Sequence, residues 1–227
     1  MSVKGSIISF EGITCSGKST LVDNFRVYLG ERKIKCFIKE DLKAYTGKDL
    51  GAEIKDILEK YRHDDYYRFG MPQLETLLIL AKRAFQSHST LINEINRGVI
   101  ILADRDIDTV CASQLVELVD KIPSLDINKT IEVIRYINNL SIMSPKLTFY
   151  LDVDICVSEI RSRRRDNKIF NKNDIDYNTK VKEYFNKVFD IAIPNRDLLV
   201  IPSNEFNSDE IFKRAKTRFE EWYQNHP

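Results

Sequence analysis

Several features are missing from this chain of 227 residues, and each absence excludes a class of protein. No run of 18 apolar residues occurs, so we expect no membrane-spanning helix and no membrane partner. The first five residues lead directly into an apolar run, and we therefore expect no signal peptide. The cysteines form no C-x-x-C pair and no zinc-ligand spacing, which indicates a reducing compartment and predicts a cytoplasmic protein. They are Cys15, Cys36, Cys111 and Cys156.

A large charge of either sign is missing too. The formal net charge is +1, so the composition gives no general attraction to nucleic acid or to an anionic membrane. No internal repeat, low-complexity tract or linker divides the chain. The length therefore predicts a single α/β domain over residues 1–227, in which a local cluster of residues binds any anion.

The loop from Gly12 to Thr20 carries the most specific pattern in the chain. Gly12 to Ser19 match G-x-x-x-x-G-K-[ST], which is typical of loops that bind nucleotide phosphates. The glycines permit a tight turn whose N–H groups face phosphate oxygens, Lys18 supplies a positive charge, and Ser19 offers a hydroxyl to Mg²⁺. An apolar run precedes the loop and a helical pattern follows it, as this chemistry requires. The residues expected to bind ATP are Gly12, Ile13, Thr14, Cys15, Ser16, Gly17, Lys18, Ser19 and Thr20.

Apolar runs and helical patterns alternate along the rest of the chain. We expect strands at 6–10, 35–39, 99–103, 146–152 and 198–201. We expect helices at 18–29, 50–61, 72–96, 109–119, 127–139, 177–192 and 208–224. The third strand is the most apolar, which predicts a central place in the sheet. The alternation predicts a mostly parallel sheet of five strands with helices on both faces.

Charged residues follow two of these strands, at the edge where open α/β sheets bind ligands. Asp104 ends the third strand and is placed to organise Mg²⁺, while Arg105 beside it can grip a phosphate with two hydrogen bonds. A structural salt bridge is the other explanation for Asp104. Glu40 and Asp41 follow the second strand, where they are either ligand-binding acids or solvated loop residues.

The densest basic cluster lies at residues 161–168, with four arginines and a lysine within eight residues. An RNA-binding stretch is one explanation, but no aromatic stacking platform or second basic patch supports it. A lid that closes over phosphates is favoured, because arginines stabilise charge on a transferring phosphoryl group. We expect this lid at about residues 161–173 and no nucleic-acid partner.

Together these stretches resemble the thymidylate kinase family of nucleoside monophosphate kinases, over nearly the whole chain. Residues 10–20 resemble the family's F-E-G-x-D-x-x-G-K-[ST]-T loop, and residues 77–83 resemble its L-L-F-A-A-D-R helix. Residues 98–105 resemble its G-x-x-V-I-x-D-R-Y stretch. Residues 151–153 resemble its L-D-V strand end, and residues 161–166 resemble its Arg-rich lid. The resemblance implies the P-loop kinase fold, a three-layer α/β/α sandwich with a mostly parallel five-stranded sheet and an Arg-rich lid.

The resemblance implies a role for each matching residue. Lys18 and the loop amides would hold the donor phosphates of ATP, and Ser19 and Asp104 would organise Mg²⁺. Arg105 would hold the acceptor phosphate, and Arg83, which its sequence context alone places on the surface, would read the base edge. Cys15 stands where some members place a catalytic arginine, so the lid would supply that charge. The catalytic set is then Lys18, Arg105, Arg161, Arg164 and Arg165, and the acceptor-binding set is Glu40, Ile79, Arg83, Arg105, Thr109 and Ser113.

Four departures from the family pattern lie on the acceptor side. Thr14 replaces the acid that meets the 3′-hydroxyl of the acceptor, Ile79 replaces a stacking Phe, and Ser113 stands where a Tyr is usual. Residues 39–41 read K-E-D in place of R-E-P. The donor side keeps the family pattern, so phosphoryl transfer is better supported than the identity of the acceptor.

The expected function is ATP- and Mg²⁺-dependent phosphoryl transfer to a nucleoside monophosphate, with dTMP as the first candidate. A deoxynucleoside kinase that uses Glu40 as general base is one alternative. A non-catalytic ATP-binding or RNA-binding protein is another. The expected partners are small nucleotides, and a homodimer is one assembly that the sequence leaves open.

Overall fold

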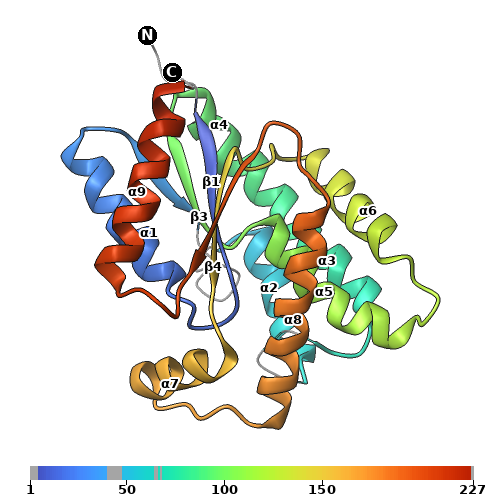
Figure 1. Cartoon of the computed structure of the whole chain (residues 1–227). Helices are drawn as coiled ribbons and strands as arrows, with labels where there is room; N and C mark the ends of the chain where they lie inside the picture. Colours follow the sequence, from blue (N-terminus) through green and yellow to red (C-terminus); the bar gives the residue numbers. More distant parts are fainter. Residues whose placement is uncertain (1–4, 40–47, 64–65, 67, 226–227) are drawn as a thin grey trace.

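The computed structural model describes residues 5–39, 48–63, 66 and 68–225. In this part of the chain one sheet of five strands has the order β2-β3-β1-β4-β5, and every neighbouring pair is parallel (Figure 1). The predicted strands are confirmed to within one residue at each end. They are β1 (Ser6–Glu11), β2 (Cys36–Lys39), β3 (Ile100–Asp104), β4 (Leu147–Asp152) and β5 (Asp197–Pro202).

The centre of the sheet is β1, so the prediction that the most apolar strand is central is wrong. β3 lies next to β1, between it and β2. Four residues of β3 and five of β1 are buried, so both strands are covered on both faces and apolarity does not distinguish their places. The central position of β1 places the phosphate loop in the middle of the carboxyl edge.

Helices lie on both faces of the sheet, which confirms the predicted three-layer α/β/α arrangement (Figure 1). One layer contains α1 (Lys18–Glu31) and α9 (Ser208–Asn225). Phe25 of α1 is fully buried there and stacks on Phe149 of β4, with ring centroids 5.4 Å apart. Phe219 of α9 meets the ring of Phe25 edge-on, so aromatic packing joins α1 and α9 to each other and to the sheet.

The other helices lie mainly on the opposite face of the sheet. The predicted helix over 72–96 contains a π-helical segment, η1, which joins α3 to α4. These helices are α2 (Leu50–Tyr61), α3 (Pro72–Gln86), η1 (Ser87–Leu91), α4 (Ile92–Asn96), α5 (Ile107–Lys121), α6 (Ile127–Asn139) and α8 (Lys172–Asp190). No helix among the described residues is long and apolar enough to span a membrane.

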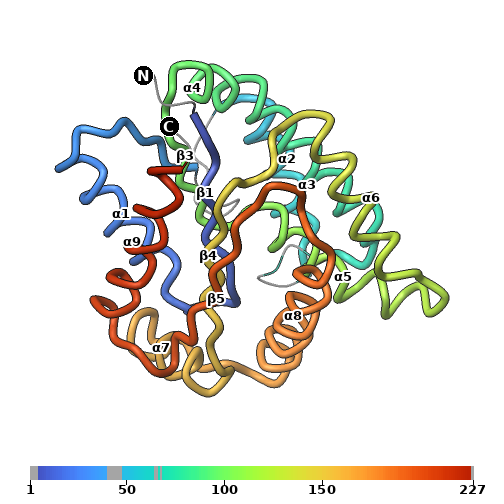
Figure 2. Tube along the Cα trace, turned by 45° about the horizontal axis from the view of Figure 1, so that its top comes forward, coloured from blue at the N-terminus to red at the C-terminus, as the bar shows by residue number. Residues whose placement is uncertain are grey.

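The predicted lid consists of the end of α7 (Ile155–Asp166), the connection after it and the first residues of α8. Figure 2 shows α7 beyond the carboxyl end of β4. Asn167 ends α7 in a left-handed conformation with φ of 53°. α8 begins five residues earlier than the predicted residue 177, because Asn171 and Asp174 form a capping box at its first turn.

Candidate active site

The phosphate loop connects β1 to α1 and takes a conformation that requires glycine at Gly12. The φ of Gly12 is 142°, and a Cβ there would lie 2.7 Å from the carbonyl oxygen of Leu151. Lys18 is buried in the first turn of α1, where its Nζ donates to the carbonyl oxygen of Ile13 at 2.7 Å and to Oγ of Ser16 at 3.2 Å. The ammonium therefore lies across the loop.

A cavity of about 400 Å³ lies against this loop and brings together residues from distant parts of the chain. The phosphate loop and Asp104 line it from the sheet edge. Four of the residues expected on the acceptor side line it as well: Ile79, Arg105, Thr109 and Ser113.

A second cavity, of about 300 Å³, lies on the other side of the phosphate loop. Cys15, Gly17 and Thr20 of the loop line it, together with residues that the sequence analysis did not assign to the site. Among these are Phe206 and Asn207, between β5 and α9. The loop thus separates two hollows, one toward α9 and one toward α5 and α8.

Ser19 and Asp104 lie together at the carboxyl edge, and their role in organising Mg²⁺ stays a prediction. Oγ of Ser19 donates to Oδ2 of Asp104 at 2.6 Å. A hydroxyl and a carboxylate are oxygen donors of the kind that Mg²⁺ takes. Among the residues described, no group of three or more Asp, Glu, His or Cys side chains is arranged so that it could hold a metal ion. Mg²⁺ needs no such cluster, because it uses one or two protein oxygens and completes its shell with phosphate and water.

Arg105 follows β3 in a left-handed backbone conformation, with φ of 72°. Its N–H donates to the carbonyl oxygen of Phe10 at 3.1 Å, and Nη1 donates to the carbonyl oxygen of Gly12 at 3.1 Å. The side chain therefore lies against the start of the phosphate loop, on the wall of the larger cavity.

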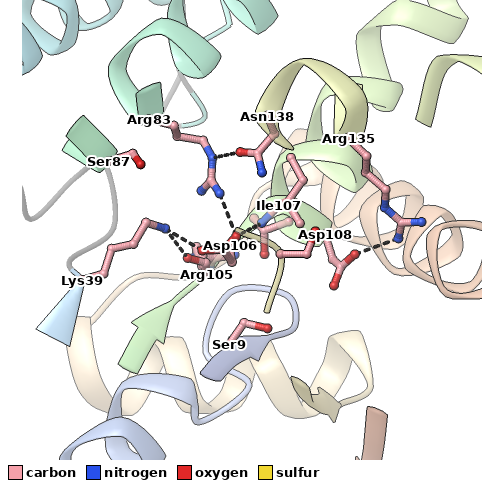
Figure 3. A network of polar contacts seen from close by, with 12 residues as sticks. Ser9, Lys39, Arg83, Ser87, Arg105, Asp106, Ile107, Asp108, Arg135 and Asn138 are labelled. Carbon is pink, nitrogen blue, oxygen red and sulfur yellow. Dashed lines mark hydrogen bonds and ion pairs between the residues drawn. The ribbon is translucent and has the colours of Figure 1, made fainter. Parts of the chain in front are cut away.

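Behind Arg105, Asp106 holds two buried cations (Figure 3). Its carboxylate pairs with Nζ of Lys39 at 2.9 Å and with Nη2 of Arg83 at 2.7 Å. Burial opposes ionisation, but Arg83 and Lys39 hold the pKa of Asp106 well below its usual range. Arg83 also donates to Asn138 at 2.9 Å.

The surface position that its sequence context suggested for Arg83 is wrong. The residue is only 7% exposed, and it is not among the residues that line the larger cavity. Its role in reading the base edge stays a prediction. Glu40 and Asp41 lie outside the described residues, and their roles stay predictions as well.

The arginines of the lid differ in their surroundings. Arg161 donates to Oγ and the carbonyl oxygen of Ser203 at 2.8 and 2.7 Å, and to the carbonyl oxygen of Ser16 at 3.2 Å. Arg161 therefore links the phosphate loop to Ser203, the residue that follows β5. Arg165 lines both cavities, whereas Arg164 lines neither of the two.

The model of the thymidylate kinase family matches residues 10–211, which include the end of β1, the other four strands of the sheet and most of the described helices. The chain belongs to the thymidylate kinase family. It is 32% identical over 181 residues to the thymidylate kinase of Kosmotoga olearia, covering 78% of each chain. It is 25% identical over 217 residues to that of Rickettsia bellii, covering 94% of this chain and 95% of the relative. The predicted family is confirmed.

Four further polar or aromatic residues on the cavity wall are not in the site predicted from the thymidylate kinase pattern: Tyr66, Gln114, Tyr177 and Asn178. The rings of Tyr66 and Tyr177 stack with centroids 3.8 Å apart. Asn178 accepts a hydrogen bond from the N–H of Thr14 at 3.4 Å, which links α8 to the phosphate loop. One signal in the sequence was the polar, aromatic stretch around Tyr66.

Glu11, in the F-E-G stretch of the thymidylate kinase pattern, is fully buried beneath the cavity. Its Oε1 accepts from the N–H of Asp106 at 2.9 Å, and its Oε2 accepts from Oγ1 of Thr109 at 2.5 Å. Burial, followed by the nearby carboxylates of Asp108 and Asp106, raises the pKa of Glu11 to about 8. Glu11 is therefore mostly protonated at neutral pH.

This protonation predicts a pH-dependent effect of Glu11→Gln on stability. The pKa of Glu11 is 4.5 ordinarily and about 8 in the folded protein, so its contribution to stability is full below pH 4.5 and is lost as the pH rises through 8. The amide of Gln does not titrate, so the variant lacks this contribution at every pH. Relative to the variant, the wild type should lose on the order of a few kcal/mol of unfolding free energy between pH 5 and 9. Urea unfolding of both proteins at pH 5, 7 and 9 checks this, and a constant difference would contradict it.

Proposed function

We propose that this protein transfers the γ-phosphoryl group of ATP to dTMP in a Mg²⁺-dependent reaction, forming ADP and dTDP. One observation carries the proposal. The phosphate loop, the Ser19–Asp104 pair and Arg105 converge on one cavity with residues expected on the acceptor side. Two phosphate-bearing substrates can therefore meet there without covalent participation by the protein, as phosphoryl transfer requires.

Each part of the site has a role in this mechanism. The loop amides and Lys18 bind the donor phosphates, and Ser19 and Asp104 would hold Mg²⁺. When bound, this ion would supply positive charge that neutralises part of the charge of the phosphates. Arg105 holds the phosphate of the acceptor in line with the transferring group. Arg165 at the junction of the two cavities supplies positive charge as the phosphoryl group moves.

The proposal extends to the protein as a whole. Residues 1–227 form a single domain with its lid at about 161–173, and its partners are small nucleotides. We place the protein in the cytoplasm, and a homodimer is the assembly to test first.

A screen of acceptors against ATP and Mg²⁺ tests the function. The acceptors are dTMP, dUMP, dCMP, UMP and thymidine, and the readout is the phosphorylated acceptor. We expect kcat/KM to be highest for dTMP. Phosphorylation of thymidine in preference to dTMP would favour a deoxynucleoside kinase, and slow ATP hydrolysis without any phosphorylated acceptor would favour a non-catalytic nucleotide-binding protein.

The lid arginines give a prediction with a control on the same helix. Arg165→Ala should lower kcat at least about 10-fold and change ATP binding less, because its charge acts mainly on the transition state. Arg163→Ala is the control, since Arg163 pairs with Glu159 on the exposed side of α7 and lines neither cavity. Steady-state kinetics and ATP titration compare the two. Equal losses of kcat in both variants would contradict the assignment.

A further inference from the structure

The conformation of Arg105 is strained, and something must hold it. Its φ of 72° lies in the left-handed region, which a residue with a Cβ adopts at a cost of about 1–2 kcal/mol. Such strain persists only where the surrounding contacts impose it, and it is concentrated at functional sites. Arg105 lines the larger cavity. The direction in which its side chain leaves the backbone depends on the backbone angles, so these angles help to place the guanidinium at the cavity wall.

Three hydrogen bonds fix the backbone around Arg105. Its N–H donates to Phe10 at 3.1 Å, and its carbonyl oxygen accepts from Nζ of Lys39 at 3.3 Å. The next N–H, of Asp106, donates to Glu11 at 2.9 Å. The first and third contacts come from β1, whereas Lys39 reaches across from the end of β2 (Figure 3).

Lys39 is not needed to neutralise Asp106. Arg83 alone pairs with that carboxylate at 2.7 Å, so the buried group holds two cations for one anion. Lys39 is only 3% exposed, and burial together with the charge of Arg83 lowers its pKa. A second buried cation therefore costs free energy. What Lys39 contributes that Arg83 does not is the hydrogen bond to the carbonyl oxygen of Arg105.

We infer that Lys39 is a positioning residue that acts through Arg105. It holds the carbonyl of Arg105, Asp106 holds Lys39, and the left-handed turn directs the guanidinium to the Gly12 carbonyl at the cavity wall. The inference rests on the proposed function, in which Arg105 binds the phosphate of the acceptor. It assigns to Lys39 a part in the use of the acceptor and none in the binding of ATP.

A double-mutant cycle tests this, with the variants Lys39→Met, Arg105→Ala and the two combined. Lys39→Met should lower kcat/KM for dTMP at least about 10-fold and change KM for ATP less than about 2-fold. In the Arg105→Ala background the same substitution should have almost no further effect, because two residues that act through one contact are not additive. Circular dichroism and thermal melting establish that each variant is folded.

The control is Lys182→Met. Lys182 also donates to the backbone carbonyl of Val153 at 3.0 Å and pairs with two carboxylates at 2.9 and 3.1 Å, and none of these contacts involves Arg105. We expect kcat/KM for dTMP to stay within about 2-fold of the wild type in this variant. Should Lys39→Met fail to fold, Lys39→Gln, which keeps an N–H donor but removes the charge and shortens the reach, carries the same cycle.

The possible failures can be told apart. Losses that multiply in the double variant, or equal losses in the use of ATP and dTMP, would overturn the inference while leaving the proposed function intact. A wild type that phosphorylates no monophosphate would overturn the proposed function itself.

Discussion

Lys18→Ala should give a folded protein whose turnover is at least about 100-fold lower than that of the wild type. Lys18 is only 5% exposed, and its Nζ lies 2.7 Å from the carbonyl oxygen of Ile13 at the start of the loop. The ammonium is therefore fixed within the phosphate loop before any substrate arrives. A charge held in place needs no reorganisation as the phosphoryl group moves, so its loss raises the barrier directly.

The measurement compares kcat and KM for both substrates in Lys18→Ala, with circular dichroism as the test of folding. Lys180→Ala is a suitable control, because Lys180 is a half-buried residue of α8 whose side chain is 42% exposed and pairs with Asp120 on α5. It should remain within about 2-fold of the wild type. A folded Lys18→Ala protein with near-normal turnover would contradict the assignment of the phosphate loop.

The alternation of strands and helices could be predicted because short apolar runs and helical spacing are local properties. The order of strands was less predictable, since β1 and β3 are buried alike and nothing local ranks them. The helix α7 was missed for a physical reason. Its buried residues are Ser158 and Ser162, so it presents no apolar stripe and its sequence shows mainly the charges of its exposed side.

The site could be predicted where one short pattern holds all the groups, as in the phosphate loop. The pairing of Ser19 with Asp104 also followed, because both residues lie at the carboxyl edge of neighbouring strands. The buried cluster around Asp106 could not be predicted. Its partners Arg83 and Lys39 are 23 and 67 residues away in the chain, and charges read from sequence are assigned to the surface by default.

Arg105→Ala should weaken the use of dTMP by about 2–4 kcal/mol, the scale of losing one partner of a buried charged pair. This corresponds to a fall of roughly 30- to 1000-fold in kcat/KM. The phosphate of dTMP is the group that distinguishes it from thymidine, and Arg105 is a cation on the cavity wall beside the start of the phosphate loop. The loss should therefore fall on the acceptor, with KM for ATP changed much less.

Two further variants separate the charge of Arg105 from its backbone. Arg105→Gly removes the same side chain but tolerates φ of 72°, so it should lose as much dTMP use as Arg105→Ala and retain more stability. Arg105→Lys keeps a positive charge without the two-pronged guanidinium, and its activity should lie between that of the wild type and that of Arg105→Ala. Kinetics with dTMP and thymidine decide the matter. If kcat/KM of the wild type for thymidine equals or exceeds that for dTMP, the acceptor needs no phosphate for Arg105 to bind, and the nucleoside kinase becomes the better assignment.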